Sequence, residues 1–287
     1  MGRIGFHTSN FSDYSIEKTV EILVDLGFDA IELNLESADN FSAHVLPNAS
    51  KQRRSEIRRV IEAAGLALSS LSAHAFMTSA NADQRKTAIA FVNDSIDLAC
   101  DLGTDIVHMA SGFVPQGATE EQAWSWLTDA VRQCVKHGQR HGVKVAMEAG
   151  VFPGLIIWNT QSMLELIDRV GHDDFYVNFD PSHYQPSGDD AVATFRKLRN
   201  RIIHMHAKDG SGNRDAFEFP PLGKGQVNWP GLAEAMIETD YRGCLSVEYE
   251  AHFFAKGYTK DPIGAARDSK SFLDEVFADW LVASGSP

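Results

Sequence analysis

The sequence predicts a single (β/α)₈ barrel that spans residues 1–287. Short β-rich runs alternate with longer helical runs along the whole chain, and no linker or low-complexity tract divides it. Eight of the short runs have strand character, and barrels of this kind typically need ~250 residues. An open doubly wound sheet usually has fewer strands and a GxGxxG loop after the first. That motif is missing there, and GxxxxGK[ST] occurs nowhere in the sequence.

The expected strands are residues 3–7, 29–35, 67–74, 105–110, 143–148, 174–180, 201–207 and 243–249. The runs between them have helical spacing. In the run 83–101, apolar residues recur at steps of three and four and form one stripe, at Ile89, Val92, Ile96 and Ala99. A glycine, which tolerates the left-handed conformation that ends many helices, stands before four of the strands: Gly27, Gly65, Gly103 and Gly142.

Composition and charge narrow the class of protein. Hydrophobic residues make up 44% and charged residues 23% of the chain, which is enough to bury a large core. The net charge of −13 disfavours a nucleic-acid partner, because affinity for phosphate backbones depends on Lys and Arg. We identify no signal peptide and no apolar run of the ~18 residues that a membrane helix needs, so we expect a cytoplasmic protein without a membrane partner. The three cysteines show no CxxC spacing.

Polar residues end four consecutive expected strands. Side chains alternate between the two faces of a strand, and in a barrel one of these faces points inward. The inward parity is shared by Glu148, Asp180, His206 and Glu248. Carboxylates that share one site cannot all ionise without a cation, so we predict one divalent metal at the C-terminal face of the barrel. This ligand set favours Mn²⁺, with Mg²⁺, Co²⁺, Fe²⁺ or Zn²⁺ as alternatives.

Several further residues are candidates for substrate binding. His74 and His108 end strands three and four on the inward parity, where they either pack in the rim or bind sugar hydroxyls. Lys208 is either a solvated lysine or a donor to a substrate oxygen, and Arg214 is a candidate substrate clamp. Glu250 shares the parity of Glu248 and competes with it as a ligand.

Aromatic residues in the expected βα loops form a further group. They are candidates for an apolar side of the substrate site: Phe113, Phe152 and Trp158.

Five segments together resemble the xylose isomerase-like barrel superfamily, the sugar phosphate isomerase/epimerase group that includes ketose 3-epimerases, hydroxypyruvate isomerase and inosose dehydratase. The segments are MEAG with Glu148, NFDPSH with Asp180 and His183, HMHAKD with His206, LGKGQVNWPGL at 222–232, and SVEYE with Glu248. The resemblance covers essentially the whole chain. It implies that Glu148, Asp180, His206 and Glu248 bind the metal and that His183 contacts the substrate.

The resemblance also implies a reaction. We expect an isomerase or epimerase of a keto-sugar or related polyol ketone that acts through a metal-stabilised enediolate, with Glu148 and Glu248 as the acid/base pair. His183 would polarise a substrate oxygen. The alternative is a lyase that eliminates a leaving group from a keto-inositol or a 3-keto-glycoside through the same enolate.

Two other readings follow from the same superfamily. It contains abasic-site endonucleases, but the Asp-x-His pair that those enzymes carry is replaced here by Phe217, Glu218 and Phe219. This replacement and the net charge argue against DNA cleavage. A non-catalytic metal-binding subunit is the remaining alternative. We expect a small-molecule partner, and barrels of this group often pair as homo-oligomers.

Overall fold

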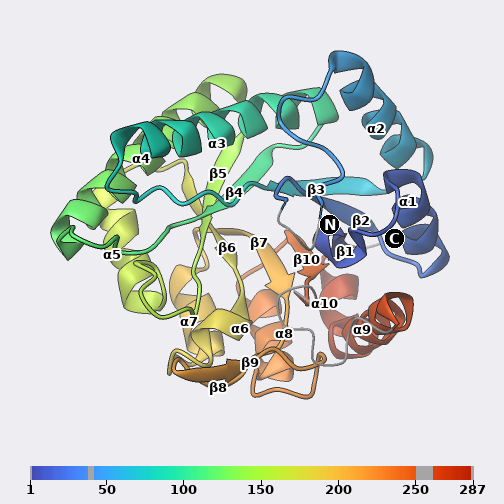
Figure 1. The fold of residues 1–287 in the computed structure, drawn as a ribbon. Coiled ribbons are helices and arrows are strands. Elements are labelled where there is room, and N and C mark those ends of the chain that lie inside the picture. The colour runs from blue at the N-terminus through green and yellow to red at the C-terminus, as the bar shows by residue number, and fades with distance from the viewer. Residues whose placement is uncertain (1, 38–41, 250–260, 286–287) are drawn as a thin grey trace.

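A closed barrel of eight parallel strands forms the centre of the molecule (Figure 1). The structure is a computed structural model that describes residues 2–37, 42–249 and 261–285. Around the barrel the strands follow the order β1-β10-β7-β6-β5-β4-β3-β2. Their bounds are β1 Arg3–His7, β2 Ala30–Asn34, β3 Ala67–Ser72, β4 Ile106–Ala110, β5 Lys144–Glu148, β6 Phe175–Phe179, β7 Ile202–Ala207 and β10 Cys244–Val247. The predicted (β/α)₈ fold is confirmed, because every expected strand overlaps one of these.

Helices surround the barrel on the outside (Figure 1). They are η1 Thr8–Phe11, α1 Ile16–Asp25, α2 Lys51–Ala63, α3 Ala82–Leu102, α4 Glu120–His141, α5 Thr160–Val170, α6 Pro181–Tyr184, α7 Ala191–Leu198, α8 Trp229–Glu238, α9 Pro262–Val276 and α10 Ala278–Ala283. A small antiparallel pair, β8 Ser211–Asn213 and β9 Ala216–Glu218, follows β7. Among the described helices, none has both the length and the hydropathy to span a membrane.

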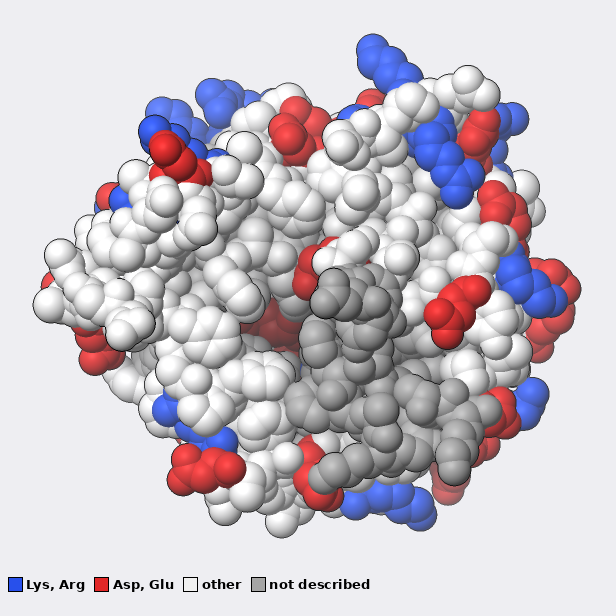
Figure 2. Space-filling view, in the orientation of Figure 1, with Lys and Arg blue, Asp and Glu red and all other residues white. Residues whose placement is uncertain are grey.

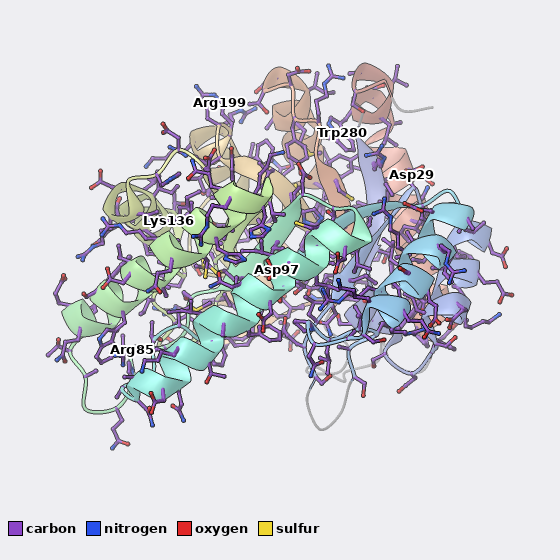
Figure 3. All side chains as sticks on the ribbon, turned by 90° about the horizontal axis from the view of Figure 1, so that it is seen from above. Asp29, Arg85, Asp97, Lys136, Arg199 and Trp280 are labelled. Carbon is purple, nitrogen blue, oxygen red and sulfur yellow. The ribbon has the colours of Figure 1, made fainter. Side chains whose placement is uncertain are left out.

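The two longest helices, α3 and α4, pack side by side. Figure 3 shows both of them, with Arg85 and Asp97 labelled on α3 and Lys136 on α4. The apolar stripe predicted for residues 83–101 faces inward, with Val92 and Ile96 fully buried. Burying each such side chain stabilises the fold by roughly 1.5–3 kcal/mol. Both helices end at a glycine with positive φ, as the sequence predicts: 90° at Gly103 and 70° at Gly142.

Asp209, directly after β7, organises the loop that leads to α8. Its buried carboxylate accepts hydrogen bonds from three backbone amides of that loop, from its own neighbour Gly210 and from the indole of Trp229. Gly225 lies so close that a Cβ there would collide with the Asp209 carboxylate. This contact explains why the segment LGKGQVNW carries a glycine at that position. The loop beside the C-terminal end of β7 is therefore fixed by one side chain.

We predict that Asp209→Ala lowers the free energy of unfolding by about 3 kcal/mol or more, because several buried donors lose their acceptor. Urea unfolding followed by circular dichroism measures the effect. Asp215→Ala is the matched control, since Asp215 is exposed in the β8–β9 connection and its replacement should change stability by less than about 0.5 kcal/mol. Equal stabilities of the two variants would contradict the organising role of Asp209.

Candidate metal centre

Four buried side chains meet at the C-terminal end of the barrel. Glu148 ends β5, Asp180 follows β6, His206 lies in β7 and Glu248 follows β10. One ligand atom from each of them lies within 4.8 Å of every other. They converge because parallel strands bring their carboxyl ends to one edge, and because the inward parity selects one side chain in two. Asp180 also caps α6, since its Oδ1 accepts from the Ser182 amide at 2.8 Å.

His206 is the centre of this group. Its Nδ1 lies 2.7 Å from Glu148 Oε1, 3.3 Å from Glu248 Oε2 and 3.9 Å from Asp180 Oδ2. Burial lowers the pKa of His206, but the charges of Glu148, Glu248 and Glu32 outweigh it and raise this pKa well above the usual value. The Nδ1 atom of His206 therefore points toward Glu148, Glu248 and Asp180, and these four side chains could bind one cation together.

The carboxylates are held in their charged forms. Burial raises the pKa of Glu148, yet the charge of His206 and hydrogen bonds from His206 and His74 bring it well below its usual value. Glu248 behaves in the same way: burial raises its pKa, and Lys208 followed by His206 lowers it strongly. Ionised carboxylates are the form that binds a divalent ion.

The donor set fits a divalent cation. Asp180 Oδ2 is buried, and it accepts no hydrogen bond from any residue that the structure describes, although Lys208 Nζ lies 2.9 Å away as an ion-pair partner. A carboxylate oxygen has two lone pairs, so the ion pair with Lys208 leaves one that a cation could use. Three carboxylates and one imidazole around one point are typical ligands of catalytic metal ions.

A buried glutamate that we did not single out in the sequence lies behind His206. Glu32, in β2, is fully buried, and its Oε1 lies 3.3 Å from His206 Nε2 and 2.5 Å from His108 Nε2. It can hold the Nε2 proton of His206 and so leave Nδ1 free as a ligand. Strand parity could have identified it, because Ala30, Glu32 and Asn34 alternate in the same way as the four centre residues.

His183 and Lys208 flank the centre. The Val151 amide lies 3.3 Å from His183 Nδ1, and His183 Nε2 lies 3.4 Å from Asp180 Oδ2. Burial and the charge of Lys208 lower the pKa of His183 to about 4. Lys208 Nζ lies 2.7 Å from Glu248 Oε2 and 3.3 Å from His183 Nε2. A neutral donor and a cation therefore stand beside the carboxylates.

A cavity of about 260 Å³ opens above the centre, and Glu148, His183, Lys208 and Glu248 line it. Figure 2 shows this face of the molecule hollowed near its middle, with acidic side chains at the bottom of the hollow. A small molecule that enters the cavity therefore meets two of the proposed ligands directly.

The other candidate substrate contacts divide into two groups. His74 lines the cavity, with its Nε2 3.0 Å from Glu148 Oε2, and Lys208 lines it as well. The structure does not bring His108 and Arg214 to the cavity lining: His108 is fully buried on Glu32, and the guanidinium of Arg214 stacks 3.9 Å from the ring of Trp158.

The aromatic candidates divide in the same way. Phe113 and Phe152 line the cavity, whereas Trp158 does not. Glu250, the residue that competes with Glu248, lies outside the described residues.

The chain is similar to several known proteins. The chain is 26% identical to the D-psicose 3-epimerase of Ruminiclostridium cellulolyticum over 278 residues, which cover 93% of this chain and 87% of the relative. It is 24% identical to the inosose dehydratase of Clostridium perfringens over 147 residues, 45% of this chain and 48% of the relative. The IolI protein, solved with a bound zinc atom, has the same fold, with a TM-score of 0.81 at 16% identity over 97% of this chain and 99% of that one.

The family model for the xylose isomerase-like TIM barrel matches residues 20–276. That stretch contains the four centre residues, Glu32 and His183. The match extends over most of the barrel, and the resemblance seen in the sequence is confirmed. This chain belongs to the xylose isomerase-like TIM barrel family.

Proposed function

We propose that this chain is a divalent-metal-dependent isomerase or epimerase of a keto-sugar or related polyol ketone. The observation that carries the proposal is the convergence of Glu148, Asp180, His206 and Glu248 at the base of a cavity. The relation to a D-psicose 3-epimerase over most of the chain supports the reaction class and a small sugar-like substrate.

Glu148, Asp180, His206 and Glu248 would hold the ion. Three carboxylates and one imidazole suit Mn²⁺, and the same set accepts Mg²⁺, Co²⁺, Fe²⁺ or Zn²⁺. When bound, a divalent cation supplies Lewis-acid stabilisation of the negative charge that develops on a carbonyl oxygen.

Glu148 and Glu248 are the proposed acid/base pair. They come from β5 and from the end of β10, which β6 and β7 separate in the barrel, and both line the cavity. One carboxylate takes the proton from the carbon beside the carbonyl, and the electron pair of that C–H bond forms the enediolate. In an isomerase the same glutamate, now protonated, returns that proton to the adjacent carbon. In an epimerase the glutamate on the other side, after taking a proton from water, delivers it to the opposite face of the same carbon.

His183 and Lys208 complete the site. The Val151 amide holds the His183 ring so that its Nε2–H can donate to a substrate oxygen. The low pKa of this imidazole keeps it a neutral donor at neutral pH. Lys208 places its positive charge against Glu248 and Asp180, which favours the ionised form of the base before proton transfer. His74 restrains Glu148 from the opposite side.

A lyase is the second candidate, and the relation to an inosose dehydratase favours it. The first step is the same proton removal. If a leaving group stands β to the carbonyl, the electrons of the enolate expel it with its bonding pair, and a protonated side chain supplies the proton that the leaving group needs.

The test is proton exchange in D₂O. Protein loaded with Mn²⁺ is incubated with a panel of keto-sugars and keto-inositols, and NMR follows the α-proton. Deuterium in recovered or isomerised sugar supports the isomerase or epimerase, whereas loss of water or of another leaving group supports the lyase. Absence of exchange with every substrate would refute the mechanism.

We predict that Glu148→Gln lowers the exchange rate by at least about a hundredfold, because the amide cannot accept the substrate proton. Glu234→Gln is the matched control, since Glu234 is exposed on α8 and the same change there should leave the rate unchanged. Metal content is measured on both variants, because Glu148 is also a proposed ligand. Full activity of a metal-loaded Glu148→Gln protein would remove Glu148 from the acid/base role.

Metal binding should release protons. The pKa of His206 is raised well above its usual value, so its ring carries a proton at neutral pH, and only the neutral ring binds a metal. We expect about one proton released per Mn²⁺ at pH 7 and an affinity that weakens as pH falls, because protons compete more strongly. Titration calorimetry in buffers of different ionisation enthalpy measures this. An apparent enthalpy independent of the buffer would show that the proton is not displaced.

Glu32→Gln should weaken Mn²⁺ binding by about 10–100-fold, because the partner that orients His206 loses its charge. Metal titration of the apo-protein, with circular dichroism to verify folding, measures the change. Glu62→Gln on the exposed face of α2 is the control. An affinity for Glu32→Gln equal to that of the unchanged protein would mean that Glu32 does not position the ligand.

A further inference from the structure

Apolar side chains, two of them exposed, gather at one side of the cavity. We define the apolar wall as Phe76, Phe113, Phe152 and Leu155, all of which line it. Phe76 is 58% exposed and Phe113 37% exposed, and their rings contact edge to face with centroids 5.2 Å apart. Exposed Phe side chains that touch each other forgo favourable burial, so a wall of this kind is typical of a binding surface.

The wall is held by the backbone of three neighbouring βα loops. Thr78 Oγ1, in the loop after β3, donates to the Phe113 carbonyl at 2.6 Å. The Val114 amide, in the loop after β4, donates to the Gly154 carbonyl in the loop after β5 at 3.1 Å. Gly112 has a φ of +100°, and a Cβ there would collide with Thr78 Oγ1. The aromatic rings therefore stand on a surface that is arranged before any ligand arrives.

Among the residues that the structure describes, the cavity offers few free polar side chains next to this wall. Ser111 lines it, but its hydroxyl already donates to the Gly112 carbonyl and accepts from the Ile157 amide. Glu36 and His74 are paired with each other at 3.4 Å. Within residues 2–37, 42–249 and 261–285, the remaining lining residues outside the metal centre and its flanking groups are Ala110, Ala149 and Gly150. A substrate hydroxyl group placed against the wall would therefore lose its hydrogen bonds to water, and the described side chains around it would not replace them.

We propose that the substrate carries an aromatic substituent that packs on the apolar wall while its hydroxy-ketone part reaches Glu148 and Glu248. A keto-glycoside with an aromatic aglycone has this chemistry. The inference rests on the proposed function for the hydroxy-ketone part, and on the wall alone for the aromatic part. An aromatic ring suits Phe76 and Phe113 because contacts between rings are favourable beyond the area that they bury, a gain that an aliphatic group does not have. Figure 2 shows that the rim of the hollow outside the grey region is mostly neither acidic nor basic.

The first experiment measures binding without catalysis. Saturation-transfer NMR follows a phenyl glycoside that has no ketone and therefore cannot react. The phenyl protons should receive most of the saturation, and Phe76→Ala and Phe113→Ala should each weaken binding by about tenfold. Val282→Ala, a truncation of an 80% exposed side chain on α10, is the control and should not weaken it. Saturation spread evenly over the sugar and phenyl protons would overturn the proposal.

The second experiment compares a phenyl and a methyl keto-glycoside with the same sugar. The α-proton exchange in D₂O should favour the phenyl compound, and the ratio of kcat/KM, phenyl over methyl, should fall about tenfold in Phe76→Ala. Phe76→Leu, which keeps most of the volume and removes the ring, should give an intermediate ratio. A ratio of one in the unchanged protein overturns the aromatic subsite and leaves the proposed function standing. Exchange with neither compound nor with the keto-sugar panel, together with phenyl binding in the first experiment, refutes the proposed function and leaves the wall standing.

The competing occupant is a second copy of this chain. Sedimentation velocity of the unchanged protein and of Phe76→Ala separates the two cases. If the variant converts a dimer to a monomer and the phenyl-to-methyl ratio does not change, the wall is an interface between copies and the proposal is wrong. An unchanged sedimentation coefficient together with a reduced ratio supports the aromatic subsite.

Discussion

Repulsion between three buried carboxylates is the constraint on which the site depends. Glu148, Asp180 and Glu248 lie within 4.8 Å of one another and are almost inaccessible to water. Their negative charges are balanced by the ring of His206 and by Lys208, which contacts both Asp180 and Glu248. A divalent ion can take over the role of the His206 proton at the same place. A divalent ion held by these carboxylates would stabilise the negative charge that develops on a substrate carbonyl oxygen during a reaction.

The barrel supplies the rigidity that this charge cluster needs. The register of the parallel strands sets the positions of Glu148, His206 and Glu248 along the barrel axis, because each lies at or next to the end of a hydrogen-bonded strand. Below them, Glu32 contacts both His206 and His108, so a layer of buried polar side chains supports the ligands from inside the barrel. Beside them, Asp209 holds the loop after β7 through five hydrogen bonds. Preorganised ligands lose little entropy when a cation binds.

The proposed reaction chemistry and the proposed substrate choice belong to different parts of the cavity. Glu148 and Glu248 lie at strand ends and His183 lies in α6, and their proposed proton transfer would serve an epimerase, an isomerase or a lyase alike. The apolar wall lies on the loops after β3, β4 and β5, which can vary without moving the strands. This division is consistent with a family whose members include an epimerase and a dehydratase.

The sequence alone predicted the eight strands, the glycine helix ends and the shared inward parity of Glu148, Asp180, His206 and Glu248, because these follow from local periodicity. Tertiary structure decided which polar residues reach the cavity. His74 and His108 share the expected inward parity, yet His108 lies within β4 and contacts Glu32 inside the barrel, whereas His74 lies beyond the end of β3 and lines the cavity. Arg214 stacks on Trp158, a residue far away in sequence. Parity gives the face of a strand, but contacts between distant segments set the depth and direction of each side chain.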